Sequence, residues 1–123
     1  MDKKILIVDD EEKIRTLLEK FLTKKGYQAL TATNGQEAIE KVKTDSPLVV
    51  LLDIRMPGMD GLAAMKKIKE VSPKTGVIMI TGVKDEEVAK KAMELEAFDY
   101  ITKPFDLNYL ETCLMVKLAL LET

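Results

Sequence analysis

Four places in the chain carry side chains that could together handle a phosphoryl group. Two adjacent carboxylates, Asp9 and Asp10, follow one short apolar run, and a third, Asp53, follows another. Carboxylates that lie close together repel one another unless a proton or a cation relieves them. An all-oxygen site of this kind suits Mg²⁺, with Mn²⁺ as the alternative ion. Lys103 offers a cation for a phosphate oxygen, and Thr81 offers a hydroxyl donor. The set predicts a site that accepts a phosphoryl group on Asp53.

Each of these residues also has an ordinary structural explanation. Asp9 or Asp10 could cap a helix, Thr81 is a residue type that favours strands, and Lys103 could be a solvated lysine. Asp53 is harder to explain in this way, because it continues the apolar run 48–52 without being a turn residue. An ionised carboxylate there is costly without compensation. The occurrence of the required chemistry at four separate strand ends favours the phosphoryl site.

Short apolar runs alternate with segments of helical periodicity along the chain. We expect strands at residues 5–8, 27–33, 48–52, 77–80 and 98–101. The apolar face of the first helix is predicted at Ile14, Leu17, Leu18, Phe21 and Leu22, which recur at helical spacing.

Polar residues predict where the helices begin and end. Asn34 with Glu37 resembles a capping box, Asp85 and Asp106 are expected N-caps, and Gly26 is expected to end the first helix.

Five strand–helix repeats predict an α/β protein with a parallel sheet covered on both faces. We expect a (βα)5 flavodoxin-like three-layer sandwich with strand order 2-1-3-4-5, formed by residues 1–123 as one domain. In such a sheet the carboxyl ends of the strands meet at one rim. The sequence therefore predicts that Asp9, Asp10, Asp53, Thr81 and Lys103 lie together.

Composition excludes several classes of function. The chain of 123 residues contains no histidine, which rules out Ser-His-Asp catalysis, histidine-ligated zinc and a histidine phosphocarrier. Its single cysteine, Cys113, rules out an internal disulfide. The net charge of −2 argues against direct nucleic-acid binding. No apolar run approaches the roughly 18 residues of a membrane span, and the apolar start is too short for a signal peptide, so we expect a cytoplasmic protein without membrane contact.

The chain resembles the receiver domain of two-component response regulators, in the CheY-like superfamily. The resemblance rests on four motifs in this order: VDDEE at 8–12, LLDIRMPGMDG at 51–61, MITG at 79–82 and DYITKPF at 99–105. It implies that Asp53 is the phosphoacceptor. It also implies Mg²⁺ held directly by Asp10 and Asp53, by Asp9 largely through water, and by the backbone carbonyl of Arg55.

The resemblance further implies a conformational switch. Thr81 and Tyr100 match the switch pair of the family, Lys103 contacts the phosphoryl group, and the Lys103–Pro104 peptide is expected to be cis. A sensor histidine kinase or a histidine phosphotransfer protein is the implied donor, and a downstream effector or output domain is the implied reader. The fourth helix, fifth strand and fifth helix form the expected reading face, which could also support a homodimer.

The last helix carries apolar residues beyond its expected core face. Tyr109, Val116 and Leu120 are candidates for the partner face. The alternative is a helix end with scattered exposed apolar residues, which are normal on protein surfaces.

Two other functions compete with a signalling module, which would show only self-phosphorylation and autodephosphorylation. A Mg²⁺-dependent phosphohydrolase with an Asp nucleophile would need an Asp-x-Asp motif and a cap, whereas Asp9 and Asp10 are adjacent. A flavodoxin-like binding protein would need a Gly-rich phosphate loop after the first strand. The resemblance also implies that Arg55 and Val83, which flank the site, are positions at which the family tunes the lifetime of the phosphorylated state.

Two positions depart from the family pattern. Glu96 stands where glycine is usual and would be strained if the backbone is left-handed there. Gly76 stands where proline is common, and we expect it only to loosen the entry to the fourth strand.

Overall fold

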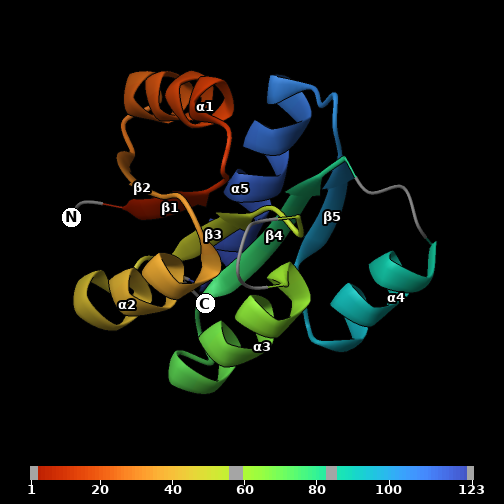
Figure 1. The fold of residues 1–123 in the computed structure, drawn as a ribbon. Coiled ribbons are helices and arrows are strands. Elements are labelled where there is room, and N and C mark those ends of the chain that lie inside the picture. Colours follow the sequence, from red (N-terminus) through yellow and green to blue (C-terminus); the bar gives the residue numbers. More distant parts are fainter. Residues whose placement is uncertain (1–2, 56–59, 83–85, 122–123) are drawn as a thin grey trace.

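Five parallel strands in the order β2-β1-β3-β4-β5 form the centre of the computed structural model (Figure 1). The structure describes residues 3–55, 60–82 and 86–121. The strands are β1 Lys4–Val8, β2 Gln28–Ala32, β3 Val49–Leu52, β4 Gly76–Thr81 and β5 Asp99–Thr102. The helices are α1 Glu12–Lys24, α2 Gly35–Asp45, α3 Gly61–Val71, α4 Glu86–Glu94 and α5 Leu107–Leu121. The predicted (βα)5 architecture and its strand order are confirmed.

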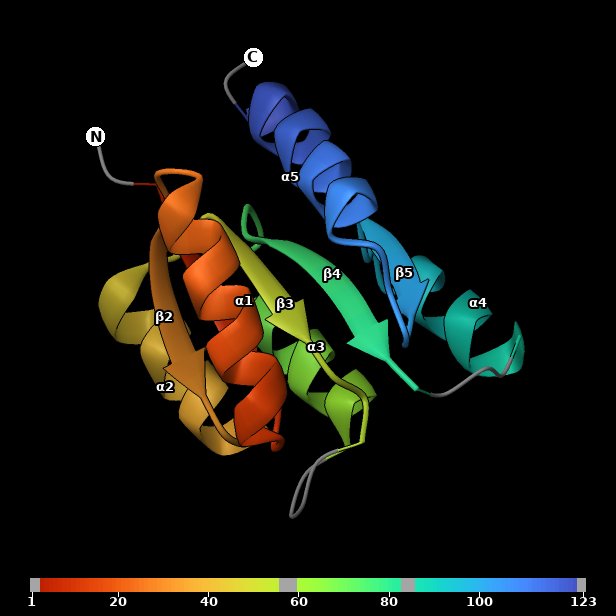
Figure 2. The same ribbon diagram turned by 90° about the horizontal axis from the view of Figure 1, so that it is seen from above.

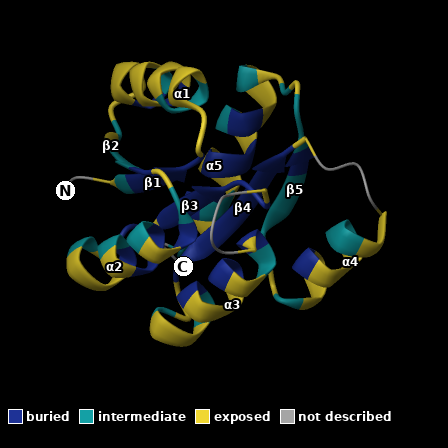
Figure 3. Ribbon diagram, in the orientation of Figure 1, coloured by how far each residue is buried: buried dark blue, intermediate teal, exposed yellow. Residues whose placement is uncertain are grey.

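Helices cover both faces of the sheet. Helices α1 and α5 lie on one face, and α2, α3 and α4 lie on the other (Figures 1 and 2). The central strands β1, β3 and β4 are buried almost throughout (Figure 3), because they supply side chains to both faces. Alternate residues of β3 point to opposite sides: Val49 and Leu51 pack towards α1 and α5, and Val50 and Leu52 pack towards α2 and α3. Two apolar clusters, one on each face, therefore hold the strands and fix the rim that they share.

One residue of the predicted core lies at the surface. The α1 side chains Leu18 and Leu22 are buried as expected, but Leu17 is 46% exposed. An apolar stripe predicted from spacing includes residues at its margin, which packing against the sheet need not cover. The prediction of Leu17 as a core residue was therefore wrong.

The helix ends largely follow the predicted signals. Gly26 follows α1 with a φ of 90°, and the Asn34 side chain accepts a hydrogen bond from the N–H of Glu37 at 2.9 Å. The expected capping box is modified, because Glu37 reaches the N–H of Thr33 at 2.7 Å rather than that of Asn34. The expected N-cap Asp85 and Val83 lie outside the described residues.

Gly76 has a different role from the one expected. A Cβ added there would lie 2.3 Å from Cε of Lys117 and 3.1 Å from both Cδ and Cγ. The Nζ of Lys117 lies 5.2 Å from the centre of the Phe98 ring. Gly76 therefore leaves room for the α5 lysine to cross the start of β4, and the expectation that it merely loosens the strand was wrong.

Across residues 3–55, 60–82 and 86–121, no helix has the length and apolar character needed to cross a membrane.

Candidate functional site

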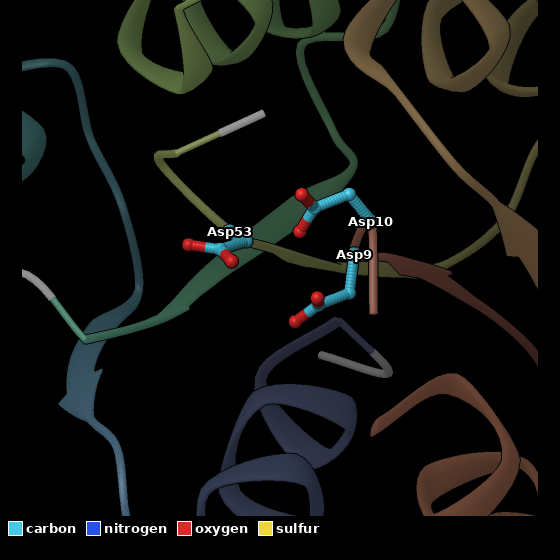
Figure 4. Close-up of side chains that lie close together, drawn as sticks. All are labelled: Asp9, Asp10 and Asp53. Carbon is cyan, nitrogen blue, oxygen red and sulfur yellow. The ribbon is translucent and has the colours of Figure 1, made fainter. Parts of the chain in front are cut away.

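The ends of β1 and β3 bring two carboxylates to the same rim. Val8 pairs with Leu52 at the last step of the ladder, and the N–H of Asp53 continues it by donating to the carbonyl of Val8 at 3.0 Å. Asp9 and Asp53 thus follow neighbouring strands, and Asp10 stands beside them. One carboxylate oxygen of each residue lies within 4.8 Å of the other two. Figure 4 shows the side chains of Asp9, Asp10 and Asp53 close together at this rim.

These carboxylates differ in exposure. Asp9 is 3% and Asp53 5% exposed, whereas Asp10 is open to solvent. Lys103 joins the two buried ones: its Nζ donates to Oδ2 of Asp9 at 2.7 Å and to Oδ2 of Asp53 at 3.2 Å. Buried carboxylates are tolerable only when paired in this manner. The loop after β5 therefore supplies the charge that the ends of β1 and β3 require.

Burial and pairing compete in setting the pKa values of the Asp9–Lys103 pair. Burial raises the pKa of Asp9 above 3.8, and hydrogen bonds from Lys103 and from the Glu11 N–H reverse only part of that rise. Burial alone would lower the pKa of Lys103, but its hydrogen bond to Asp9 and the charges of Asp53 and Asp9 outweigh burial and raise it above 10.5. The Asp9 shift therefore comes mainly from burial, whereas the Lys103 shift comes from its two carboxylate partners. Three carboxylates gather around this one lysine, and a further cation would relieve their repulsion.

Backbone groups hold the two buried carboxylates in place. The N–H of Glu11 donates to Oδ1 of Asp9 at 2.9 Å, and the N–H of Arg55 donates to Oδ1 of Asp53 at 3.2 Å. The N-cap position of α1 belongs to Glu11, with no side-chain hydrogen bond. The alternative that Asp9 or Asp10 caps this helix is therefore not supported.

Two charged residues at this rim were missed from the sequence. The guanidinium of Arg15 donates to the backbone carbonyl of Asp9 at 2.7 Å, and Oε1 of Glu11 lies 3.6 Å from Nζ of Lys103. Both belong to the start of α1, where the N–H of Arg15 donates to the carbonyl of Glu11. Their position one turn apart just after the acidic pair is a signal that could have found them.

Gly61 lets α3 begin directly against the backbone of the acceptor loop. A Cβ there would lie 2.4 Å from Cα of Ile54 and 2.6 Å from the carbonyl oxygen of Asp53. The N–H of Gly61 also donates to the carbonyl of Ile54 at 2.9 Å. Gly61, which ends the LLDIRMPGMDG motif, therefore holds the start of α3 against the backbone that carries Asp53.

Comparison with known proteins identifies the family of this chain. The family model described as "Response regulator receiver domain" matches residues 5–115. The chain is a response regulator receiver domain. It is 40% identical over 108 residues to Sporulation initiation phosphotransferase F of Bacillus subtilis, covering 88% of this chain and 87% of that protein. A crystal structure of a CheY-like response regulator receiver domain protein from Methanospirillum hungatei has a TM-score of 0.96 and 30% identity, covering 99% of this chain and 98% of that one.

Other relatives are longer than this receiver domain. It is 44% identical over 106 residues to the Alkaline phosphatase synthesis transcriptional regulatory protein PhoP of Bacillus subtilis, covering 85% of this chain and 44% of that protein. The match to NtrC of Klebsiella pneumoniae covers 83% of this chain and 22% of that protein. The chain thus spans less than half the length of these two regulators. Membership of the family makes it a signalling module that accepts phosphorylation.

The remaining predicted site residues of the receiver domain lie around the same rim. Thr81 is fully buried at the end of β4, and its carbonyl accepts a hydrogen bond from the N–H of Lys103 at 2.8 Å. The Lys103–Pro104 peptide is cis. Tyr100 is half-buried and packs against the apolar cluster on the α2–α4 side. A Cβ at Gly82 would meet no atom within 4 Å. The end of β4 therefore leaves open space beside Asp53.

A divalent ion fits the residues at this rim. A hollow of about 280 Å³ is lined by Asp10, Glu11, Asp53, Arg55, Gly82 and Lys103. Its donors are carboxylate oxygens, the ligand type that Mg²⁺ prefers, and one of them, Asp10, is solvent-accessible. Three clustered carboxylates that share one lysine favour a cation.

Proposed function

We propose that Asp53 is the phosphoryl acceptor of this receiver domain and that the reaction requires Mg²⁺. The observation that carries the proposal is that Lys103 joins two buried carboxylates, Asp9 and Asp53, from strand ends 94 and 50 residues away. A purely structural role would not need two carboxylates on neighbouring strands. The ion would be held by Asp10 and Asp53, by Asp9 through water, and by the carbonyl of Arg55, and it would neutralise charge during transfer.

In the proposed reaction, a carboxylate oxygen of Asp53 attacks the phosphorus atom of a phosphorylated histidine or a small acyl phosphate. The new O–P bond forms as the bond to the leaving nitrogen or oxygen breaks, and the leaving group takes the bonding pair. Lys103 already contacts Asp53, so its ammonium needs only a small shift to meet a phosphoryl oxygen. Attack by water on the phosphorus later restores the carboxylate, which is the autodephosphorylation expected of such a module.

We infer that phosphorylation is read through Thr81 and Tyr100. Thr81 lies at the end of β4, and Tyr100 pairs with Met79 one strand away. Movement of the Thr81 hydroxyl towards the new phosphoryl oxygens would leave space into which the half-buried Tyr100 ring could turn. Such a change is a local charge event that biases a two-state element.

The face formed by α4, β5 and α5 is the proposed partner surface. Tyr109 is 50%, Val116 49% and Leu120 56% exposed, and all three lie on α5. We propose a sensor histidine kinase or histidine phosphotransfer protein as donor and an effector or output domain as reader, with homodimer formation through this face as a further use. Sedimentation with and without beryllofluoride tests the dimer, which is excluded by a monomer in both states at every concentration reached.

Phosphorylation by acetyl phosphate tests the proposed acceptor. We expect a mass increase of one phosphoryl group in the presence of Mg²⁺, followed by slow loss after the donor is removed. Asp53→Asn should abolish the mass increase, whereas the matched control Asp45→Asn should keep it. Chelation of the metal should also abolish it. Undiminished labelling of Asp53→Asn would refute the assignment, and continuous turnover of phosphoesters would favour a phosphohydrolase.

A further inference from the structure

Asp99 receives three hydrogen bonds at the start of β5. Its Oδ1 accepts from the N–H of Tyr100 at 2.7 Å, and its Oδ2 accepts from the hydroxyl of Tyr109 at 2.8 Å and from the thiol of Cys113 at 3.1 Å. Tyr109 and Cys113 are four residues apart and lie on the same side of α5. A single carboxylate therefore connects the first residues of β5 with the first two turns of α5.

The donors on α5 keep their protons at neutral pH. The hydrogen bond to Asp99 is the main cause that raises the pKa of Tyr109 to about 12. Burial, followed by the hydrogen bond to Asp99, raises the pKa of Cys113 to about 11. Hydrogen bonds from neutral donors to a carboxylate are stronger than those between neutral groups. Tyr109 and Cys113 therefore keep the protons that they donate to Asp99.

Asp99 and Tyr100 act on opposite faces of the sheet. The side chain of Asp99 reaches α5, whereas the ring of Tyr100 packs against the apolar cluster on the α2–α4 side. Adjacent strand residues alternate in this way. The N–H of Tyr100 donates to Oδ1 of Asp99, so a displacement of the backbone at Tyr100 that accompanies the ring movement would also displace the Asp99 carboxylate.

We propose that Asp99 is a positioning residue that couples the switch strand β5 to helix α5, with Tyr109 at the exposed end of the connection. The proposal rests on the proposed function of Asp53 and describes how phosphorylation of Asp53 would change the partner surface. When the Tyr100 ring moves, Asp99 carries Tyr109 and the start of α5 with it. Because Tyr109 is half-exposed, this movement changes the surface that a partner contacts.

Backbone amide NMR shifts with beryllofluoride and Mg²⁺ test this coupling in the full chain. The amides of Asp53 and Gly82 report occupancy of the site, and those of Val116 and Leu120 report the response of α5. In the unmodified protein both pairs should shift on saturation. In Asp99→Asn and Tyr109→Phe the site amides should keep their shift, while the α5 shift should fall to less than half. The double variant should fall no further, because both changes break one connection.

Tyr27→Phe and Asp45→Asn are the matched controls, since they remove a hydroxyl and a charge elsewhere and should preserve both shifts. If Asp99→Asn fails to fold, Tyr109→Phe alone decides the question, because it removes only an exposed hydroxyl. A full α5 shift in Tyr109→Phe, even with a lowered melting temperature, would overturn the coupling and leave a structural role. If the site amides of the unmodified protein do not shift at all, the proposed function itself fails, and the coupling with it.

Discussion

Two half-buried lysines at opposite ends of the sheet have opposite pKa shifts. Lys103 follows β5 at the carboxyl end, where Asp9 and Asp53 raise its pKa despite burial. Lys69, in the last turn of α3, donates to the carbonyls of Pro73 at 2.9 Å and Thr75 at 3.0 Å near the amino end of β4. Burial lowers the pKa of Lys69, Lys117 lowers it further, and Glu96 opposes part of the change.

The contrast shows that the two ends of the sheet have different functions: the carboxyl end carries the proposed phosphoryl site, and the amino end carries a structural lysine. Lys103 faces two buried carboxylates, so its ammonium can pair with a phosphoryl group when one of them is modified. Lys69 faces backbone carbonyls, so it closes a turn, and these partners cannot accept a phosphoryl group. The two residues are of the same type and are similarly buried. The groups that each lysine faces therefore decide its function.

The largest expected effect comes from neutralising each lysine in turn. Lys103→Met should slow phosphorylation of Asp53 by acetyl phosphate by more than about tenfold, because the cation beside the developing phosphoryl charge is lost. Lys69→Met should leave that rate within about twofold, since Lys69 contacts only the amino end. Initial rates of mass increase at fixed Mg²⁺ provide the measurement. Equal losses in the two variants would abolish the distinction between the ends.

A matched pair of glycine substitutions should separate the ends by stability. Gly61→Ala should cost about 2–4 kcal/mol, because its Cβ would overlap the backbone of Asp53 and Ile54, which cannot yield without moving the acceptor. Gly76→Ala should cost about 1 kcal/mol or less, because its Cβ meets the flexible end of Lys117. Denaturant unfolding measures both. The ranking is wrong if Gly76→Ala is the more damaging change.

Glu96 provides a smaller test at the amino end. Its φ of 72° confirms the left-handed conformation that was suspected, in which a non-glycine residue is strained. Glu96→Gly should therefore raise stability by about 0.5–1 kcal/mol, less than the full relief, because the attraction between Glu96 and Lys69 is lost. Thermal unfolding provides the measurement, with Ser46→Gly, at a φ of 49°, as the matched control. An unchanged or lowered melting temperature for Glu96→Gly would contradict the strain.

The smallest expected effect is a difference in pH dependence, measured in metal-free buffer. The pKa of Lys69 is lower in the folded than in the unfolded chain, so its charging cost disappears as the pH rises towards 10.5. As the pH rises towards 10.5, the free energy of unfolding of the unmodified protein should therefore rise relative to that of Lys69→Met. The pKa of Lys103 is higher in the folded chain, so its contribution is full below 10.5 and is lost as the pH rises further. Relative to Lys103→Met, stability should therefore fall above pH 10.5, and parallel curves would contradict the assigned shifts.

Much of the rim could be predicted because parallel strands share one direction. Once the alternation of strands and helices predicts a parallel sheet, residues that follow its strands must meet at the carboxyl edge. Asp9, Asp10, Asp53 and Lys103 were placed together on this ground, and the structure brings them within contact or near it. The short sequence distance between each strand and its polar residue leaves little freedom in that prediction.

Other features depend on distances between segments far apart in the sequence. Spacing placed Leu17 on the apolar face of α1, but the packing of α1 against the sheet decides how far that face is covered. Glycine at 76 was explained only by the path of Lys117, 41 residues later. The two hydrogen bonds from α5 to Asp99 depend on the angle at which α5 crosses β5, which no local pattern reports.

By itself, therefore, the sequence determined the fold class and the residues of the acidic rim, since these follow from periodicity and from the direction of the chain. The strand order was expected from the fold type, and the structure confirms it. Tertiary structure alone decided that Lys69 faces backbone carbonyls and that Asp99 connects β5 to α5. The physical reason is that charge and hydrogen bonding act over a few ångströms of space, whereas sequence patterns record separation along the chain.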